Sequence, residues 1–342
     1  MAIERDPETM NGLKHAAVRG GVLLLSGRVV NLLLNIVSML VLARLLVPED
    51  FGLFAMVAVL MNFLVIFTDP GLSAVTMQRQ NITQQQISNL FWVNAGLGLV
   101  LALLMLLLAP LLLWFYGDDR LFSMVWALAS VFLITGLGIQ HEALLRREMR
   151  FRKLVILELA ALVGSITVGL SFAVNGAGYW ALVAMPISAA VLKTMSFWLF
   201  VDWTPHWPAR NAGTRSLLAF GGHLTASNLI TYLMKNLDDM LIGWRWGAAS
   251  LGLYSMAYRL FLLPVQQIAG SLGSVAIVSL SRLTQKRERF KSFYLRMVMA
   301  IAYVSMPLVM WVGLLSDEVF LLFLGEEWSA SADIFSVFAC TA

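Results

Sequence analysis

Long apolar segments follow one another along almost the whole chain, separated by short polar stretches. Hydrophobicity within them is continuous rather than alternating, which favours helices over strands. A hydrocarbon core about 30 Å thick is crossed by roughly 20 helical residues, so each segment is long enough to span a membrane. The predicted spans are residues 21–46, 51–68, 87–113, 121–140, 155–174, 179–200, 217–243, 249–279 and 293–315. This pattern predicts an all-α polytopic membrane protein.

Lys and Arg alternate in abundance between successive loops. One set of alternate loops holds 16 of these residues and the other set holds 3. Basic residues in short loops mark the cytoplasmic side, so we expect the N-terminal segment 1–20 to be cytoplasmic. That segment is rich in charge and no small-residue cleavage site follows the first apolar run. The first span is therefore interpreted as an anchor that is retained.

Composition agrees with a membrane protein. Hydrophobic residues make up 59% and charged residues 13% of the chain, with a mean hydropathy of +0.79. A soluble domain is about one-quarter charged. The pI of about 9.3 comes from the basic loops, so no nucleic-acid partner is expected. The single cysteine, Cys340, excludes an intrachain disulfide and a Cys-based metal site. Trp residues at span ends, including Trp114, Trp244 and Trp328, are interpreted as interfacial anchors.

The chain repeats itself at an offset of 200 residues. Residues 51–56 (FGLFAM) correspond to 251–256 (LGLYSM). A polar stripe repeats at the same offset, with Arg28, Asn31, Asn35 and Ser38 matching Asn228, Thr231, Lys235 and Asp238. The repeat contains an even number of spans, so the two copies have the same orientation and are related by an axis along the membrane normal.

This repeat predicts two six-helix bundles, the first over residues 21–200 and the second over 217–342, joined by a cytoplasmic linker at 201–216. The second bundle holds only three full helices and the start of a fourth before the sequence stops. A second full copy would extend beyond residue 342, so we expect the sequence to be C-terminally incomplete.

Polar residues of the first span lie on one helical face. Arg28, Asn31 and Asn35, with Ser38, are spaced i, i+3, i+7 and i+10. The small polar residues can form interhelical hydrogen bonds. Arg28 can extend back to the interface or face a polar cavity and bind an anion. The candidate substrate-binding residues are Arg28, Asn31, Asn35, Lys235, Arg259 and Gln266.

The seventh span carries three charges inside it. Lys235 and Asp239 are an i, i+4 pair that can neutralise each other locally. Two carboxylates accompany one ammonium, so Asp238 and Asp239 are candidates for coupling to a proton or sodium ion. On the eighth span, Arg259 shares a face with Gln266 and small residues, which favours either a cavity lining or a close helix contact.

Four other polar residues have simpler interpretations. Asp69 precedes Pro-Gly and is expected to cap the next turn. Lys193 is expected to extend to the cytoplasmic interface, and Glu158 lies near the same side. His223 is interpreted as a hydrogen-bonding group rather than a ligand.

No catalytic motif is present in the sequence. It has no Gly-rich phosphate loop, no nucleotide-binding domain and no His/Cys/Asp cluster at metal-ligand spacing. We therefore expect neither an enzyme nor a cofactor or metal. Energy for transport would come from an ion gradient or the membrane potential.

Two segments resemble a known family. Residues 43–53 (ARLLVPEDFGL) resemble the opening signature of the polysaccharide-exporter flippases. Residues 236–243 (NLDDMLIG), followed by 251–258, resemble their seventh-to-eighth helix signature. These flippases belong to the multidrug/oligosaccharidyl-lipid/polysaccharide (MOP) exporter superfamily, which includes the MATE transporters. The likeness covers essentially the whole chain.

The resemblance implies a V-shaped pair of helical bundles that works by alternating access. It implies flipping of an undecaprenyl-pyrophosphate-linked oligosaccharide across the bacterial inner membrane, for export of O-antigen, capsule or exopolysaccharide. The expected partners are the lipid-linked oligosaccharide, membrane lipids and the polysaccharide polymerase or export machinery. Cation-coupled multidrug efflux on the same fold is the alternative, although a basic cavity suits anions better. A membrane glycosyltransferase or polymerase would need a larger extracytoplasmic loop.

Overall fold

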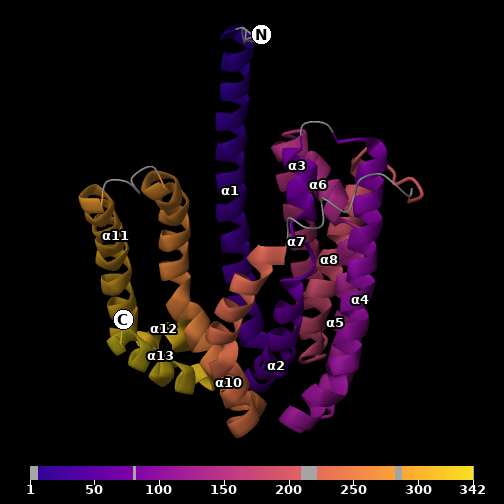
Figure 1. Ribbon diagram of the computed structural model, residues 1–342. Coiled ribbons are helices and arrows are strands. Elements are labelled where there is room, and N and C mark those ends of the chain that lie inside the picture. Colours follow the sequence, from indigo (N-terminus) through magenta and orange to yellow (C-terminus); the bar gives the residue numbers. More distant parts are fainter. Residues whose placement is uncertain (1–6, 80–81, 209–221, 282–286, 342) are drawn as a thin grey trace. The chain divides into compact units, whose positions relative to one another are not determined.

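A computed structural model describes residues 7–79, 82–208, 222–281 and 287–341 (Figure 1). Apart from one short 3-10 helix, the regular elements in these ranges are α-helices, and the ranges contain no strand. The helices are α1 (Pro7–Leu45), α2 (Pro48–Val65), α3 (Leu72–Gln78), α4 (Gln84–Tyr116), α5 (Arg120–Gly136), α6 (Ile139–Arg147), α7 (Phe151–Val174), α8 (Trp180–Phe200), α10 (Gly222–Ser281), α11 (Arg287–Leu314), α12 (Ser316–Phe323), η1 (Glu326–Trp328) and α13 (Ser329–Thr341).

Seven helical segments in the described ranges are long and apolar enough to cross a membrane: Leu23–Leu45, Pro48–Val65, Gln84–Tyr116, Arg120–Arg147, Phe151–Val174, Trp180–Phe200 and Arg287–Leu314. They correspond to the first six predicted spans and the last one. The prediction of an all-helical, multi-pass membrane protein is confirmed.

One predicted span is interrupted in the structure, and a second break lies between two predicted spans. The span predicted at 121–140 divides into α5 and α6, because two i→i−3 hydrogen bonds tighten the chain at Leu137 (3.2 Å) and Gly138 (2.9 Å). The spans predicted at 217–243 and 249–279 fall on α10, in which Gly247 has φ 80° and separates two helical parts. Residues 217–221 lie outside the described ranges, as do the side chains of His223, Asn228 and Thr231.

The chain divides into two compact units. The first contains residues 1–46 and 53–245, and the second contains residues 47–52 and 246–342. The division predicted from the sequence, with a boundary at 201–216, stays a prediction.

The longest apolar helix of the first unit, α4, has clear start and stop signals. The Thr83 hydroxyl accepts a hydrogen bond from the Gln86 amide (3.3 Å), and the Gln86 side chain accepts one from the Thr83 amide (3.1 Å). This reciprocal pair satisfies backbone donors that the first turn leaves unpaired. The helix ends at Gly117, whose φ of 71° is a left-handed conformation that glycine adopts without strain.

Small residues allow close helix packing in the first unit. A methyl group at Gly98 of α4 would lie 2.6 Å from the Phe132 carbonyl oxygen of α5. A methyl group at Gly27 of α1 would lie 2.6 Å from a Val155 methyl of α7. Glycine at such positions lets neighbouring backbones approach, which is a common basis of helix association in membranes.

In the second unit, the two copies of the repeated signature meet. A methyl group at Gly52, near the start of α2, would overlap the Ala248 carbonyl oxygen of α10. A methyl group at Gly252 would overlap the Pro48 carbonyl oxygen. The same glycine of each copy therefore contacts the backbone of the other copy.

Trp328 packs on this contact rather than at a membrane interface. Its ring meets Phe51 edge to face, with centroids 5.2 Å apart, and it is fully buried. The prediction that Trp328 is an interfacial anchor was wrong, because the residue belongs to the core of the second unit. Trp114 and Trp244 are 79% and 57% exposed, as interfacial anchors would be.

Candidate functional site

The polar stripe on α1 is satisfied within the helix. The Asn35 side-chain amide donates to the Asn31 carbonyl (2.8 Å) and to the Asn31 side-chain oxygen (2.9 Å). The Ser38 hydroxyl donates to the Asn35 carbonyl at 3.0 Å. In the part of the chain that the structure describes, these bonds stay inside α1, so the interhelical bonding expected of these residues is not observed.

Arg28 stands at the exposed end of the same stripe. Its neighbours Leu25 and Val29 are also exposed, while Gly27 packs against Val155. Among the described residues Arg28 has no hydrogen bond or ion pair. The guanidinium group is therefore available to bind an anion.

Lys235 and its neighbouring carboxylates do not form the local pair that the sequence suggested. Lys235 is exposed and makes no ion pair with Asp239 among the described residues. Asp238 and Asp239 are half-buried, and the Oδ1 atom of Asp239 is shielded from solvent without a hydrogen-bond donor in the described ranges. A buried carboxylate oxygen without a donor favours a bound proton or cation.

Two tyrosines accompany Asp239. Tyr116, at the end of α4, and Tyr232, on α10, both interact electrostatically with its carboxylate. The Tyr232 hydroxyl donates a hydrogen bond to the Val59 carbonyl of α2 at 2.6 Å. The Tyr232 hydroxyl therefore links α10 to the backbone of α2.

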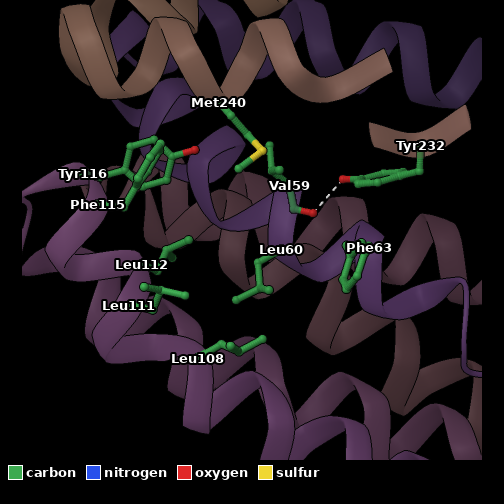
Figure 2. A pocket seen from close by; sticks show the side chains of 10 residues that line it. All are labelled: Val59, Leu60, Phe63, Leu108, Leu111, Leu112, Phe115, Tyr116, Tyr232 and Met240. Atoms are coloured by element: carbon green, nitrogen blue, oxygen red, sulfur yellow. Dashed lines mark hydrogen bonds between the residues drawn. The ribbon is translucent and has the colours of Figure 1, made fainter. Parts of the chain in front are cut away.

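An apolar pocket of about 310 Å³ adjoins these tyrosines (Figure 2). Three helices of the first unit line it: α2, the second half of α4 and the beginning of α10. The lining residues are Val59, Leu60, Phe63, Leu108, Leu111, Leu112, Phe115, Tyr116, Tyr232 and Met240. The side-chain oxygens in this set are the two tyrosine hydroxyls. No pattern in the sequence singled this pocket out.

Arg259 and Gln266 lie on the part of α10 that belongs to the second unit. Both are exposed, and Arg259 has no ion pair among the described residues. Arg28 and Lys235 belong to the first unit. A cavity that combines Arg28, Lys235 and Arg259 stays a prediction.

A network of four charges links three helices of the first unit. Arg146 contacts Glu142 (2.8 Å) and Glu158 (3.5 Å), and Lys193 contacts the same two carboxylates at 2.8 and 3.7 Å. Lys193 pairs with opposite charges on α6 and α7, and its extension to the cytoplasmic interface stays a prediction. In the sequence, the i, i+4 spacing of Glu142 and Arg146 indicates one ion pair of this network. The other two members, Glu158 and Lys193, come from α7 and α8, so the spacing does not indicate them.

A cavity of about 220 Å³ is lined by Glu142 and Arg146 of this network and also by Asp69 and Ser73. The Ser73 amide donates to the Asp69 carboxylate at 3.1 Å, and the Ser73 hydroxyl bonds the same carboxylate. The predicted capping role of Asp69 is confirmed. Arg147 donates to the carbonyls of Thr76 (2.6 Å) and Arg79 (2.7 Å) at the end of α3. These bonds attach the end of α6 to the end of α3.

The segment after α8 is held against α4. The Trp92 indole donates to the His206 carbonyl (2.9 Å), and the Gln85 side chain donates to the Trp207 carbonyl (2.8 Å). Trp92 and Trp207 stack with centroids 5.7 Å apart. The first part of the predicted linker, residues 201–208, is therefore packed on the first unit.

Comparison with known proteins identifies the family. Residues 41–333 match the family described as "Polysaccharide biosynthesis protein". The chain is 30% identical over 285 residues to the teichuronic acid biosynthesis protein TuaB of Bacillus subtilis (strain 168), covering 81% of this chain and 58% of that protein. It is 24% identical over 329 residues to the lipopolysaccharide biosynthesis protein WzxC of Escherichia coli (strain K12), covering 94% and 64%. The chain thus spans about three-fifths of these relatives.

A solved structure shows the same fold. The lipid II flippase MurJ in an inward closed conformation matches with a TM-score of 0.65 and 12% identity, over 94% of this chain and 72% of that one. This likeness shows that the two chains share a helical fold. From the family match and the membrane-spanning helices together, we conclude that the chain belongs to the polysaccharide biosynthesis protein family and is a multi-pass membrane protein.

Proposed function

We propose that the whole protein flips a lipid-linked oligosaccharide, carried on undecaprenyl pyrophosphate, between membrane leaflets for surface polysaccharide export. The family assignment supports this proposal most strongly. A large polar head group cannot cross hydrocarbon unaided, because each unpaired polar group costs several kcal/mol there. A polar path formed by two helical bundles that alternate in access would remove that barrier.

Cationic side chains in apolar helices support an anionic substrate. Arg28, Lys235 and Arg259 each lie within a predicted span, and none is neutralised by an ion pair among the described residues. Charges at membrane depth are costly and usually mark a substrate or ion pathway. We infer that these three residues, with Asn31, Asn35 and Gln266, contact the pyrophosphate and the sugars.

Ion coupling is assigned to the acidic pair of α10. Asp239 has a shielded carboxylate oxygen without a hydrogen-bond donor in the described ranges, and Asp238 adjoins it. A proton or sodium ion bound there would compensate the burial of negative charge. Its release to one side would couple an ion gradient to the change in access.

The location and partners follow from the substrate. We place the protein in the bacterial inner membrane with its N-terminus cytoplasmic, as the distribution of Lys and Arg indicates. Its product would pass to a polysaccharide polymerase or export complex. We assign it no catalytic activity.

Deletion of the gene tests this function. We expect surface polysaccharide to be lost and the lipid-linked oligosaccharide to accumulate in the cytoplasmic leaflet, with both restored by the full-length gene. Normal polysaccharide together with increased drug sensitivity would refute the proposal and favour multidrug efflux.

A further inference from the structure

The two ends of the apolar pocket in the first unit differ in polarity. Figure 2 shows Tyr116, Tyr232 and Met240 around one end, with Leu108 and Leu111 at the other. Asp239 directly precedes Met240 in the sequence, and the two tyrosine hydroxyls are the side-chain oxygens of the lining. The other end contains only hydrocarbon side chains. The pocket therefore changes from polar to apolar along its length.

The depth of the pocket in the membrane determines whether water or lipid surrounds it. The α2 and α4 residues that line it lie inside two of the candidate spans, Pro48–Val65 and Gln84–Tyr116. Leu108 lies eight residues before the end of α4, which corresponds to roughly 12 Å along a helix. Leu111 is 57% exposed, so the pocket opens to the surroundings of the protein. At that depth the surroundings are hydrocarbon, and a water-filled apolar pocket would be unfavourable.

The ten residues that line the pocket include no cationic side chain, which limits how an amphiphile can enter. A phosphate or pyrophosphate group inside it would find no opposite charge in the lining. The pocket is therefore suited to the hydrocarbon part of a lipid and not to its head group. Four aromatic rings, Phe63, Phe115, Tyr116 and Tyr232, line the pocket, and aromatic rings pack favourably against a chain that contains planar double bonds.

We propose that this pocket binds a segment of the isoprenoid chain of the lipid-linked substrate, beyond its pyrophosphate. This inference rests on the proposed function for the identity of the lipid. It assigns the first unit a second contact with the substrate, separate from the cationic residues that would bind the head group. Holding the chain there would keep the lipid attached to the protein while its head group crosses.

Site-specific photo-crosslinking in native membranes tests the pocket. Benzoylphenylalanine would replace Leu111, which lines the pocket, or Leu107, which lies one turn earlier on α4, is 74% exposed and does not line it. We expect mass spectrometry to find isoprenoid lipid enriched at position 111 over position 107. Bulk phospholipid in equal proportion at both positions, or a crosslink from position 111 to another segment of the protein itself, would overturn the proposal.

A filling variant gives a second measurement. Leu112→Trp would occupy the pocket, whereas Leu107→Trp would add the same side chain outside it. With equal expression, we expect polysaccharide export to fall about tenfold or more for Leu112→Trp only, equivalent to roughly 1.4 kcal/mol. Equal export in the two variants would contradict the proposal. If deletion of the gene left export normal while position 111 still captured isoprenoid lipid, the proposed function would fail and the pocket assignment would stand.

Discussion

Replacement of Gly252 by alanine should destabilise the contact between the two copies of the repeated signature. The new methyl group would overlap the Pro48 carbonyl oxygen and approach the Gly52 amide nitrogen to 3.0 Å. The obstructing atoms belong to the backbone, so neither can rotate away. Relief of the overlap requires α2 and α10 to move apart, which would also disturb the packing of Trp328 on Phe51.

The magnitude follows from two opposing effects. Overpacking in a well-packed region costs about 1–3 kcal/mol, and a backbone obstruction belongs at the upper end of that range. Alanine is favoured over glycine in a helix by up to about 1 kcal/mol. The net effect expected for Gly252→Ala is a loss of about 1–2 kcal/mol of stability. Gly52→Ala should behave in the same way, because its methyl group would overlap the Ala248 carbonyl.

Gly96→Ala is the matched control. Gly96 lies inside α4, and a methyl group there would meet no atom within 4 Å. The same chemical change should therefore be neutral or stabilising by up to about 1 kcal/mol. The assay is the thermal unfolding midpoint of the purified protein in detergent. Equal midpoints for Gly252→Ala and Gly96→Ala would refute the close backbone contact.

Two further predictions concern charged pairs in the first unit. Lys193→Met should lower the stability of the folded protein by about 1 kcal/mol, because the carboxylates of Glu142 and Glu158 would then share a single cation, Arg146. Adding Glu158→Gln should restore part of that stability in thermal unfolding in detergent. Stability losses that simply add in the double variant would contradict this coupling. In the loop after α4, the hydrogen bond from Arg120 holds the pKa of Asp118 below its usual value, so its small contribution is present above the unfolded-state pKa and is lost as the pH falls through the folded-state pKa. In Asp118→Asn, the thermal unfolding midpoint should therefore fall less steeply as the pH is lowered. An unchanged pH dependence at acid pH would contradict the ion pair between Asp118 and Arg120.

Continuous hydrophobicity was sufficient to predict seven of the spans, because in lipid every backbone polar group must bond within its own helix. It did not predict the break at Gly138, where local hydrogen bonds tighten a run that is continuously apolar in the sequence. Gly247, in contrast, lies between the predicted spans 217–243 and 249–279. The ion pairs of Lys193 could not be predicted either, because its partners Glu142 and Glu158 come from other helices. Trp328 resembled an interfacial residue by its place at the end of a span, yet a ring brought from far along the chain buries it.

The central claim is a positively charged path for an anionic lipid head group, and removal of its charges tests that claim most directly. The triple variant Arg28→Ala, Lys235→Ala and Arg259→Ala would be compared in the full-length protein with Arg150→Ala, which removes an exposed charge from the loop between α6 and α7. With equal expression, we expect the triple variant to lose surface polysaccharide export and the loop variant to keep it. Normal export by the triple variant would contradict the account.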